Sequence, residues 1–265
     1  MSAENSLANF LDVLADAAGR AILPHFRTAM AVEDKTAAGS GKAYDPVTIA
    51  DRAAEAAMRA LIGLHHPSHG ILGEEFGPER TDAEHVWVLD PIDGTRAFIS
   101  GLPVWGTLIG LTRDGVPNLG MMYQPFTGER FAGDGRRAWY RGPDGTRTLR
   151  ARPCAELSDA VLFTTTPALF KGAAREAYDR VESRVRLARY GCDCYAYCMV
   201  AAGHVDVVVE TGLQAYDIVP LIPVIEGAGG IVTDWAGNPA PQGGSVVASG
   251  DRRLHAQVLA LLAGG

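Results

Sequence analysis

The 265-residue chain lacks an apolar run that approaches the roughly 20 residues a membrane-spanning helix needs. Its first residues include Glu4, Asp12 and Asp16 and no basic segment before an apolar stretch, so they do not resemble a secretory signal. We therefore expect a cytoplasmic protein with no membrane partner. Basic residues are outnumbered by acidic ones, 24 against 31, and the net charge of −7 argues against a nucleic-acid partner.

Cysteine is also scarce. The chain has four, and the three that cluster, Cys192, Cys194 and Cys198, lack the paired C-x-x-C spacing of zinc and redox sites. We interpret them as reduced thiols packed around the start of a helix. A zinc-based or thiol-based chemistry is therefore not expected, and the acidic residues become the better guide to function.

The most informative stretch, residues 87–101, reads WVLDPIDGTRAFISG. The apolar residues 86–89 predict a short buried strand, which Pro91 is expected to end because it has no backbone donor. Asp90 and Asp93 then meet at the carboxyl end of this strand. Two carboxylates placed so close together repel each other unless a cation lies between them.

The same stretch has the chemistry of a magnesium and phosphate site. Carboxylate oxygens are hard ligands, which favours Mg²⁺ over zinc or copper. Gly94 permits a turn, and Thr95 starts a short helix whose free N–H groups and dipole favour an anion. The alternative is a plain turn, because Asp-Pro and Asp-Gly are both common turn dipeptides. Taken alone, the stretch leaves both interpretations open.

Two further acidic segments lie upstream. Thr48 followed by Asp51 resembles a capping box with Asp in place of the usual Glu, directly before a helical pattern over residues 54–62. Capping alone explains both residues; beside the Asp-rich turn, Asp51 also becomes a candidate to hold a water molecule at a metal. Glu74 and Glu75 follow an apolar strand, so one of them is a candidate ligand, although such pairs are usually solvated.

The remaining pattern separates two halves. Four apolar segments divided by turn signals predict an antiparallel meander: residues 104–112, 118–123, 129–132 and 138–141. After about residue 155 strands alternate with helices, among them helices predicted over 168–181 and 216–227, so this half is α/β. We expect lobes at 1–150 and 151–265 in one compact unit. Residues 36–43 are either a linker or a loop that closes over a ligand, in which case Lys42 meets an anion.

The acidic segments occur together in a familiar order: D-P-V-T-x-A-D (45–51), G-E-E (73–75), D-P-I-D-G-T (90–95) and Asp217 before an apolar helix. In this order and spacing, over most of its length, the chain resembles the inositol monophosphatase superfamily. It departs from the usual W-D of the last block, where it has Tyr216 before Asp217. Residues 190–210 and 216–230 are similar to the branch that hydrolyses L-histidinol phosphate.

The resemblance implies an α/β (α+β) fold, a layered αβαβα sandwich that is usually dimeric, with Mg²⁺ as cofactor at about two or three ions per site. It implies metal ligation by Glu74, Asp90, the Ile92 carbonyl, Asp93 and Asp217. Catalytic roles fall on Glu74, Asp51 and Thr95, the last two orienting the attacking water. The amides of Gly94 and Thr95 would receive the phosphate.

This assignment is chemically coherent. Enzymes typically lower reaction barriers by about 8–23 kcal/mol. Two cations about 3.5–4 Å apart can activate water and neutralise the leaving oxygen of a phosphate ester. The transition state leaves little covalent work for side chains, so a Ser, Cys or His nucleophile is not required.

Substrate choice depends on other residues. L-Histidinol phosphate carries an amine and an imidazole, and we expect Asp193, at a predicted helix start, and Glu210, at the end of an apolar strand, to meet them. The alternative for Asp193 is a helix N-cap. Arg189 is a further candidate for substrate binding. Inositol 1-phosphate or another small sugar phosphate is the rival substrate. A nucleotide phosphate would need more cations than Lys42, Arg96 and Arg189, and a purely regulatory protein would have lost ligand acids that are all present here.

Overall fold

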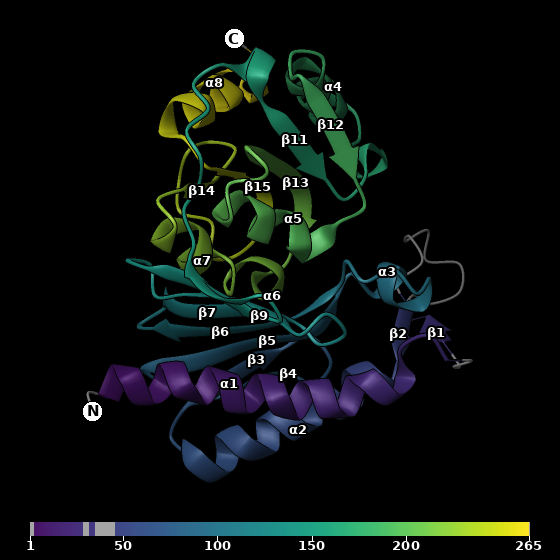
Figure 1. The fold of residues 1–265 in the computed structure, drawn as a ribbon, viewed down its shortest axis with the longest axis vertical. Helices are drawn as coiled ribbons and strands as arrows, with labels where there is room; N and C mark the ends of the chain where they lie inside the picture. Colours follow the sequence, from purple (N-terminus) through teal and green to yellow (C-terminus); the bar gives the residue numbers. More distant parts are fainter. Residues whose placement is uncertain (1–2, 29–31, 35–45, 265) are drawn as a thin grey trace.

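A computed structural model of the chain describes residues 3–28, 32–34 and 46–264. The predictions for residues 36–43, including Lys42, lie outside the described residues. Figure 1 shows five layers in the order αβαβα, with the first helices at one end of the molecule and the last helix at the other. The fold class predicted from the sequence is therefore confirmed. Within the described residues, no helix is long and apolar enough to cross a bilayer.

The first layer consists of α1 (Ala3–Ile22) and α2 (Ile49–His65), which pack together against the larger sheet. The apolar face of α1 is buried at helical spacing, through Leu11, Leu14, Ala18 and Ile22. These side chains share one core with Trp87 and Ile109 of the sheet. The helical spacing of the apolar residues between 6 and 26 predicts a packing helix, which forms over Ala3–Ile22 and is followed by a 3₁₀ turn at Leu23–His25.

The larger sheet has eight strands in the order β10-β9-β8-β7-β6-β5-β3-β4. Their bounds are β3 (Gly70–Gly73), β4 (Gly77–Glu79), β5 (His85–Asp93), β6 (Gly106–Arg113), β7 (Val116–Gln124), β8 (Glu129–Gly133), β9 (Ala138–Gly142) and β10 (Gly145–Thr148). Strands β6 to β9 form the predicted antiparallel meander, whereas β3 and β5 pair in parallel. Strands β1 (Val32–Asp34) and β2 (Pro46–Thr48) pair with each other as a separate ribbon.

Strand β5 does not end at Pro91, so that prediction is wrong. It continues to Asp93 because the pairing with β6 shifts register between Asp90 and Asp93. A bulge of this kind leaves one residue unpaired, and proline can occupy it because no ladder donor is needed there. The Pro91 carbonyl is still satisfied, since Thr107 Oγ1 donates to it at 2.8 Å.

The smaller sheet has the order β12-β11-β13-β15-β14, with β11 paired in parallel to both neighbours and the other pairs antiparallel. Its strands are β11 (Val161–Thr164), β12 (Leu187–Tyr190), β13 (Val207–Leu213), β14 (Ile231–Asp234) and β15 (Gly244–Ser249). The outer layer is α4 (Ala173–Glu182) with α8 (Arg252–Leu262). Helix α4 begins later than the predicted residue 168, because residues 167–169 form a 3₁₀ turn and Gly172 follows at φ 53°. The division into lobes at residue 150 stays a prediction.

The middle layer lies between the sheets and contains α5 (Asp193–Ala201), α6 (Ala215–Ile218) and α7 (Ile222–Gly227). The single helix predicted over 216–227 is wrong: it divides around Pro220, as expected for a residue that interrupts helical hydrogen bonding. Gly110, Gly120 and Gly133 pair in register across β6, β7 and β8. A Cβ on Gly120 would overlap the Pro220 carbonyl, so this row lets the α6–α7 segment lie directly on the sheet.

Candidate active site

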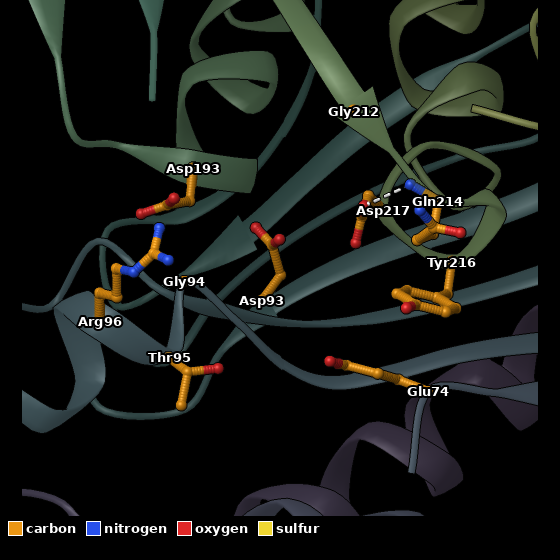
Figure 2. A pocket seen from close by; sticks show the side chains of 10 residues that line it. All are labelled: Glu74, Asp93, Gly94, Thr95, Arg96, Asp193, Gly212, Gln214, Tyr216 and Asp217. Carbon is orange, nitrogen blue, oxygen red and sulfur yellow. Dashed lines mark hydrogen bonds between the residues drawn. The ribbon is translucent and has the colours of Figure 1, made fainter. Parts of the chain in front are cut away.

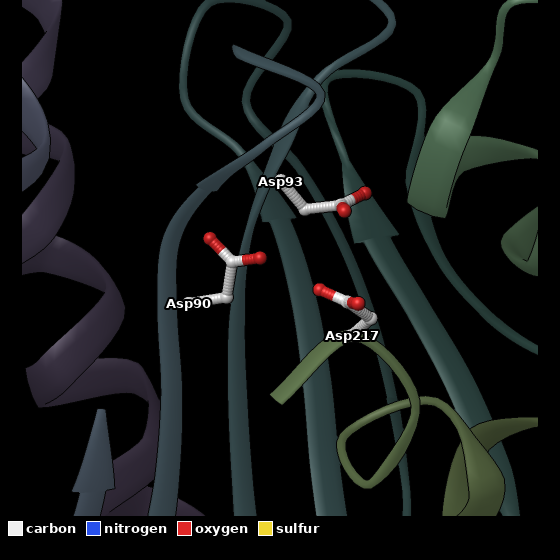
Figure 3. Close-up of side chains that lie close together, drawn as sticks. All are labelled: Asp90, Asp93 and Asp217. Carbon is white, nitrogen blue, oxygen red and sulfur yellow. The ribbon is translucent and has the colours of Figure 1, made fainter. Parts of the chain in front are cut away.

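Three carboxylates converge where the two halves of the chain meet. Asp90 and Asp93 come from the end of β5, and Asp217 comes from α6. One oxygen from each lies within 4.8 Å of the others, and Figure 3 shows the three side chains pointing toward one another. The cluster places residues that are far apart in the sequence around one point, as the predicted ligand set requires.

Burial and mutual repulsion both disfavour the ionised form of these carboxylates. Burial, followed by the charges of Glu74, Asp93 and Asp217, raises the pKa of Asp90 well above its usual range. Burial also raises the pKa of Asp93 well above its usual range and that of Asp217 to about 7. Close acids of this kind suit a divalent cation, and an all-oxygen donor set fits hard cations such as Mg²⁺.

Backbone N–H groups fix the orientation of each carboxylate. Asp90 Oδ1 accepts from the Ile92 N–H at 3.1 Å, and Asp93 Oδ2 accepts from the Cys194 N–H at 2.6 Å. Asp217 Oδ2 accepts from the Gln214 N–H at 2.7 Å, as part of a capping box at the start of α6. The acids are thus held by the main chain of their surroundings, which preorganises them for a ligand.

A pocket of about 380 Å³ opens beside the acids. It is lined by Glu74, Asp93, Gly94, Thr95, Arg96, Asp193, Gly212, Gln214, Tyr216 and Asp217, drawn in Figure 2. Its size is near the lower end of the range for small-molecule sites, about 300–1,000 Å³. Of the two neighbouring glutamates, Glu74 lines the pocket, whereas the side chain of Glu75 is 2% exposed and lies 3.9 Å from Arg52 Nε.

Asp51 is buried at the first turn of α2. The predicted capping box with Thr48 is confirmed: the Thr48 N–H and Oγ1 donate to Asp51 Oδ2 at 2.9 and 2.5 Å. Burial, with a smaller effect of Glu74, raises the pKa of Asp51 to about 6. Thr95 Oγ1 donates to the Ile92 carbonyl at 3.0 Å, so two of the predicted site residues are hydrogen-bonded to each other.

The turn at Gly94 lies against α5. Gly94 has φ 84°, and a Cβ on it would lie 3.1 Å from Asp193 Oδ2, so only glycine suits this position. Asp193 itself has φ 42°, an unusual conformation for a residue with a side chain. The N-cap of α5 is Cys192, with no side-chain cap bond. Capping therefore does not explain Asp193, whose carboxylate faces the pocket and lies 3.4 Å from Thr165 Oγ1.

Comparison with known proteins identifies the family. The inositol monophosphatase family profile matches residues 4–264. The chain belongs to the inositol monophosphatase family. It is 46% identical to "Bifunctional phosphatase IMPL2, chloroplastic" of Arabidopsis thaliana, over 94% of this chain and 72% of that protein. It is 39% identical to a histidinol-phosphatase of Mycobacterium tuberculosis, over 83% and 85% of the two chains. A solved inositol monophosphatase structure from Zymomonas mobilis superposes with a TM-score of 0.88 at 40% identity, covering 99% of this chain and 100% of that one.

The resemblance inferred from the sequence is therefore confirmed, and the chain is a phosphatase of this family. Not every predicted site residue reaches the pocket. Glu210 is buried on β13 and accepts a hydrogen bond from the Thr165 N–H, and burial raises its pKa to about 7. Arg189 is exposed on the edge strand β12, and among the described residues it does not line the pocket. The basic residue that does line the pocket is Arg96.

Three lining residues were not anticipated from the sequence: Gly212, Gln214 and Tyr216. A signal for one of them existed, because Gln214 precedes Asp217 by three residues, as Thr48 precedes Asp51. In both pairs the acid of a capping box also belongs to the predicted site. A carboxylate that caps its own helix is held rigidly, which suits a residue that must also serve a ligand.

Proposed function

We propose that this phosphatase hydrolyses L-histidinol phosphate in a Mg²⁺-dependent reaction of histidine biosynthesis. The observation that carries the proposal is a mostly buried carboxylate, Asp193, that faces the pocket beside the turn expected to receive the phosphate. Such a group suits a cationic substrate better than an uncharged polyol. The 39% identical relative from Mycobacterium tuberculosis is named a histidinol-phosphatase, which supports the same choice.

The residues of the site have separable roles in this proposal. Magnesium would be held by Glu74, Asp90, the Ile92 carbonyl, Asp93 and Asp217. When bound, it supplies activated water and charge neutralisation at the leaving oxygen. Gly94 and Thr95 offer their N–H groups to the phosphate at the start of α3 (Thr95–Ile99).

Asp51 and Thr95 orient the attacking water. Asp51 is suited to this role because its capping box with Thr48 fixes the carboxylate beside the acid cluster. Thr95 keeps its hydroxyl in place through its bond to the Ile92 carbonyl. Neither residue forms a covalent intermediate in this scheme, which agrees with the absence of a predicted nucleophile.

Asp193 meets the amine or the imidazole of the substrate. Burial raises the pKa of Asp193, and nearby Arg96 opposes that rise. Glu210 accepts a hydrogen bond from the Thr165 N–H. The Thr165 hydroxyl in turn donates to Asp193. We therefore assign direct contact to Asp193 and an indirect role to Glu210, through the placement of Thr165 and through its charge. Arg189 has no support from its exposed position on β12.

Inositol 1-phosphate is the second candidate substrate, because the solved structure at 40% identity is that of an inositol monophosphatase. Phosphate release from L-histidinol phosphate, inositol 1-phosphate and simple sugar phosphates, with and without Mg²⁺, separates the candidates. We expect the highest kcat/KM on L-histidinol phosphate. Asp193→Asn should lower that value by about tenfold or more, the worth of one charge-assisted hydrogen bond, and leave slow inositol phosphate turnover nearly unchanged. Equal loss on both substrates would refute the assignment of Asp193.

The homodimer and the cytoplasmic location stay predictions. Sedimentation equilibrium at micromolar concentration tests the first, with a mass of twice 28.1 kDa expected. Cell fractionation tests the second, and the relative from Arabidopsis thaliana, named chloroplastic, makes that test informative.

A further inference from the structure

Glu55 is a buried acid that the predicted mechanism leaves unused. It lies on α2 one turn after Asp51, and its exposed fraction is 0%. Its carboxylate accepts from the Glu75 N–H at 2.7 Å and from the Phe76 N–H at 3.2 Å. Arg59 Nε donates to the same carboxylate at 2.8 Å. Burying a carboxylate is costly unless it is paired and hydrogen-bonded, and Glu55 has both kinds of partner.

The contacts of Glu55 surround one predicted metal ligand. A Cβ on Gly73 would overlap Glu55 Oε1, so the chain passes directly over the carboxylate just before Glu74. The next two N–H groups, of Glu75 and Phe76, bind it just after Glu74. Glu74 itself donates its N–H to the Leu89 carbonyl of β5 at 3.1 Å. The backbone on both sides of Glu74 thus contacts the Glu55 carboxylate. The N–H of Glu74 is hydrogen-bonded to β5, the strand that carries Asp90.

Arg59 completes the arrangement. Its guanidinium is bonded to Glu55 and to the Gly77 carbonyl, and lies 3.4 Å from Glu79 Oε2. The Arg59 side chain is only 14% exposed, so the ion pair with Glu55 is largely shielded from water. A buried carboxylate is tolerated when a cation and hydrogen-bond donors satisfy it, and here both are present.

We propose that Glu55 is a positioning residue for metal binding, which sets the Gly73–Phe76 turn so that Glu74 presents its carboxylate to the acid cluster. This rests on the proposed function, in which Glu74 is a metal ligand. The three groups of the described residues that are bonded to Glu55 are all donors, and an ionised carboxylate can accept from all of them because neither of its oxygens carries a proton. Glutamine at this position would turn its NH₂ group toward at least one N–H. Helix α2 then serves the site twice, through Asp51 and, by way of the backbone, through Glu55.

Calorimetric titration of the metal-free full chain with MgCl₂ tests this without relying on turnover. Glu55→Gln should weaken Mg²⁺ binding by about 10- to 100-fold, as is typical when the groups that orient a ligand are changed. Phosphate release at saturating Mg²⁺ should then recover to near the wild-type kcat. Glu79→Gln is the matched control, because it removes the exposed carboxylate beside Arg59 and leaves Glu55 in place. It should leave Mg²⁺ affinity unchanged.

A double-mutant cycle shows whether Glu55 acts through Glu74. In a Glu74→Gln background, Glu55→Gln should weaken the remaining Mg²⁺ binding by less than about twofold, because its target is already gone. Full multiplication of the two effects, or unchanged affinity in Glu55→Gln alone, would overturn the proposal. Should Glu55→Gln fail to fold, Gly73→Ala disturbs the same contact and decides by the same titration, with lost affinity supporting the proposal and unchanged affinity overturning it. A wild-type chain that binds no Mg²⁺ overturns the proposed function itself, a result distinct from either.

Discussion

The backbone N–H of Cys194 donates to Asp93 Oδ2 at 2.6 Å across 101 residues of sequence. This bond joins the first turn of α5, in the middle layer, to the end of β5 in the larger sheet. The neighbouring residues repeat the contact, since Asp193 lies against Gly94. The candidate active site therefore forms only when the two halves of the chain are assembled, and its acids are oriented by elements from both.

The Cys194 thiol also contacts Asp93, but the backbone N–H that holds the carboxylate does not depend on it. Cys194→Ala keeps the N–H, so we expect kcat/KM to fall by less than about fivefold, the equivalent of about 1 kcal/mol. Steady-state phosphate release at saturating Mg²⁺ measures this. Complete inactivation of a folded Cys194→Ala protein would show that the thiol takes part in the chemistry.

The glycine row across β6, β7 and β8 predicts a strong effect far from the pocket. Gly120→Ala would push its Cβ into the Pro220 carbonyl, displacing the segment that leads from Asp217. We expect the free energy of unfolding to fall by about 1–3 kcal/mol. Mg²⁺ affinity should fall with it. Urea unfolding and calorimetry measure the two effects.

Gly63→Ala is the matched control for that substitution. Gly63 lies in α2 with open space around its Cβ position, so alanine should stabilise the helix by about 0.5–1 kcal/mol and leave Mg²⁺ affinity alone. If Gly120→Ala is as harmless as Gly63→Ala, the close approach of the two layers is misassigned.

Magnesium should stabilise the fold as well as support turnover. A ligand that binds only the folded state adds about 2.7 kcal/mol at a concentration of 100 times its dissociation constant. We therefore expect Mg²⁺ to raise the thermal midpoint and a chelator to lower it. Asp217→Asn should reduce the response to Mg²⁺ and, by removing one of the crowded charges, should not destabilise the metal-free protein. Scanning calorimetry of both proteins with EDTA and with Mg²⁺ tests this, and equal responses would contradict it.

The free energy of unfolding should fall in acid because of His255. Its ring is buried between Thr233 and Ser249, and burial, with Arg252 nearby, lowers its pKa to about 4 from the usual 6.5. Between about pH 6.5 and pH 4 the unfolded chain therefore binds a proton at His255 that the folded chain does not. The contribution of the neutral ring to the free energy of unfolding is complete above about pH 6.5 and is lost as the pH falls through 4. At about 1.4 kcal/mol per pKa unit, the loss is on the order of 3 kcal/mol.

Urea unfolding between pH 7 and pH 4, in the presence of a chelator, measures that slope. His255→Gln removes the titrating group while keeping a polar side chain, so the difference between the two proteins isolates it. The variant should lose less stability than the wild type on acidification. Parallel curves for the two proteins would mean that His255 is not the group responsible.

The sequence was most informative where chemistry is local. Asp90 and Asp93 stand three positions apart, and short patterns predicted that these two acids lie together and that Thr48 and Asp51 form a capping box. Hydrophobic periodicity likewise predicted α1 and the meander of β6 to β9. Each of these features depends on residues that are close in the chain or repeat at a fixed spacing.

Features that depend on long-range contacts were missed. Pro91 was expected to end β5, but the register shift against β6 accommodates it. The division of α6 from α7 is an exception, because Pro220 is a local signal that predicts an interrupted helix. The contact between Glu55 and the backbone beside Glu74 joins two segments that are about 20 residues apart, and no sequence pattern predicts it. Arg189 was assigned to the substrate by its charge, which does not reveal that β12 is an edge strand.

The central claim is that Asp90 and its neighbours hold the cations on which phosphate release depends. Asp90→Asn, titrated with Mg²⁺ by calorimetry and assayed for phosphate release from L-histidinol phosphate, tests it most directly. We predict loss of at least one Mg²⁺ site and a fall in kcat/KM of about a thousandfold, equivalent to roughly 4 kcal/mol of transition-state stabilisation. An Asp90→Asn protein with wild-type Mg²⁺ binding and wild-type turnover would contradict the account.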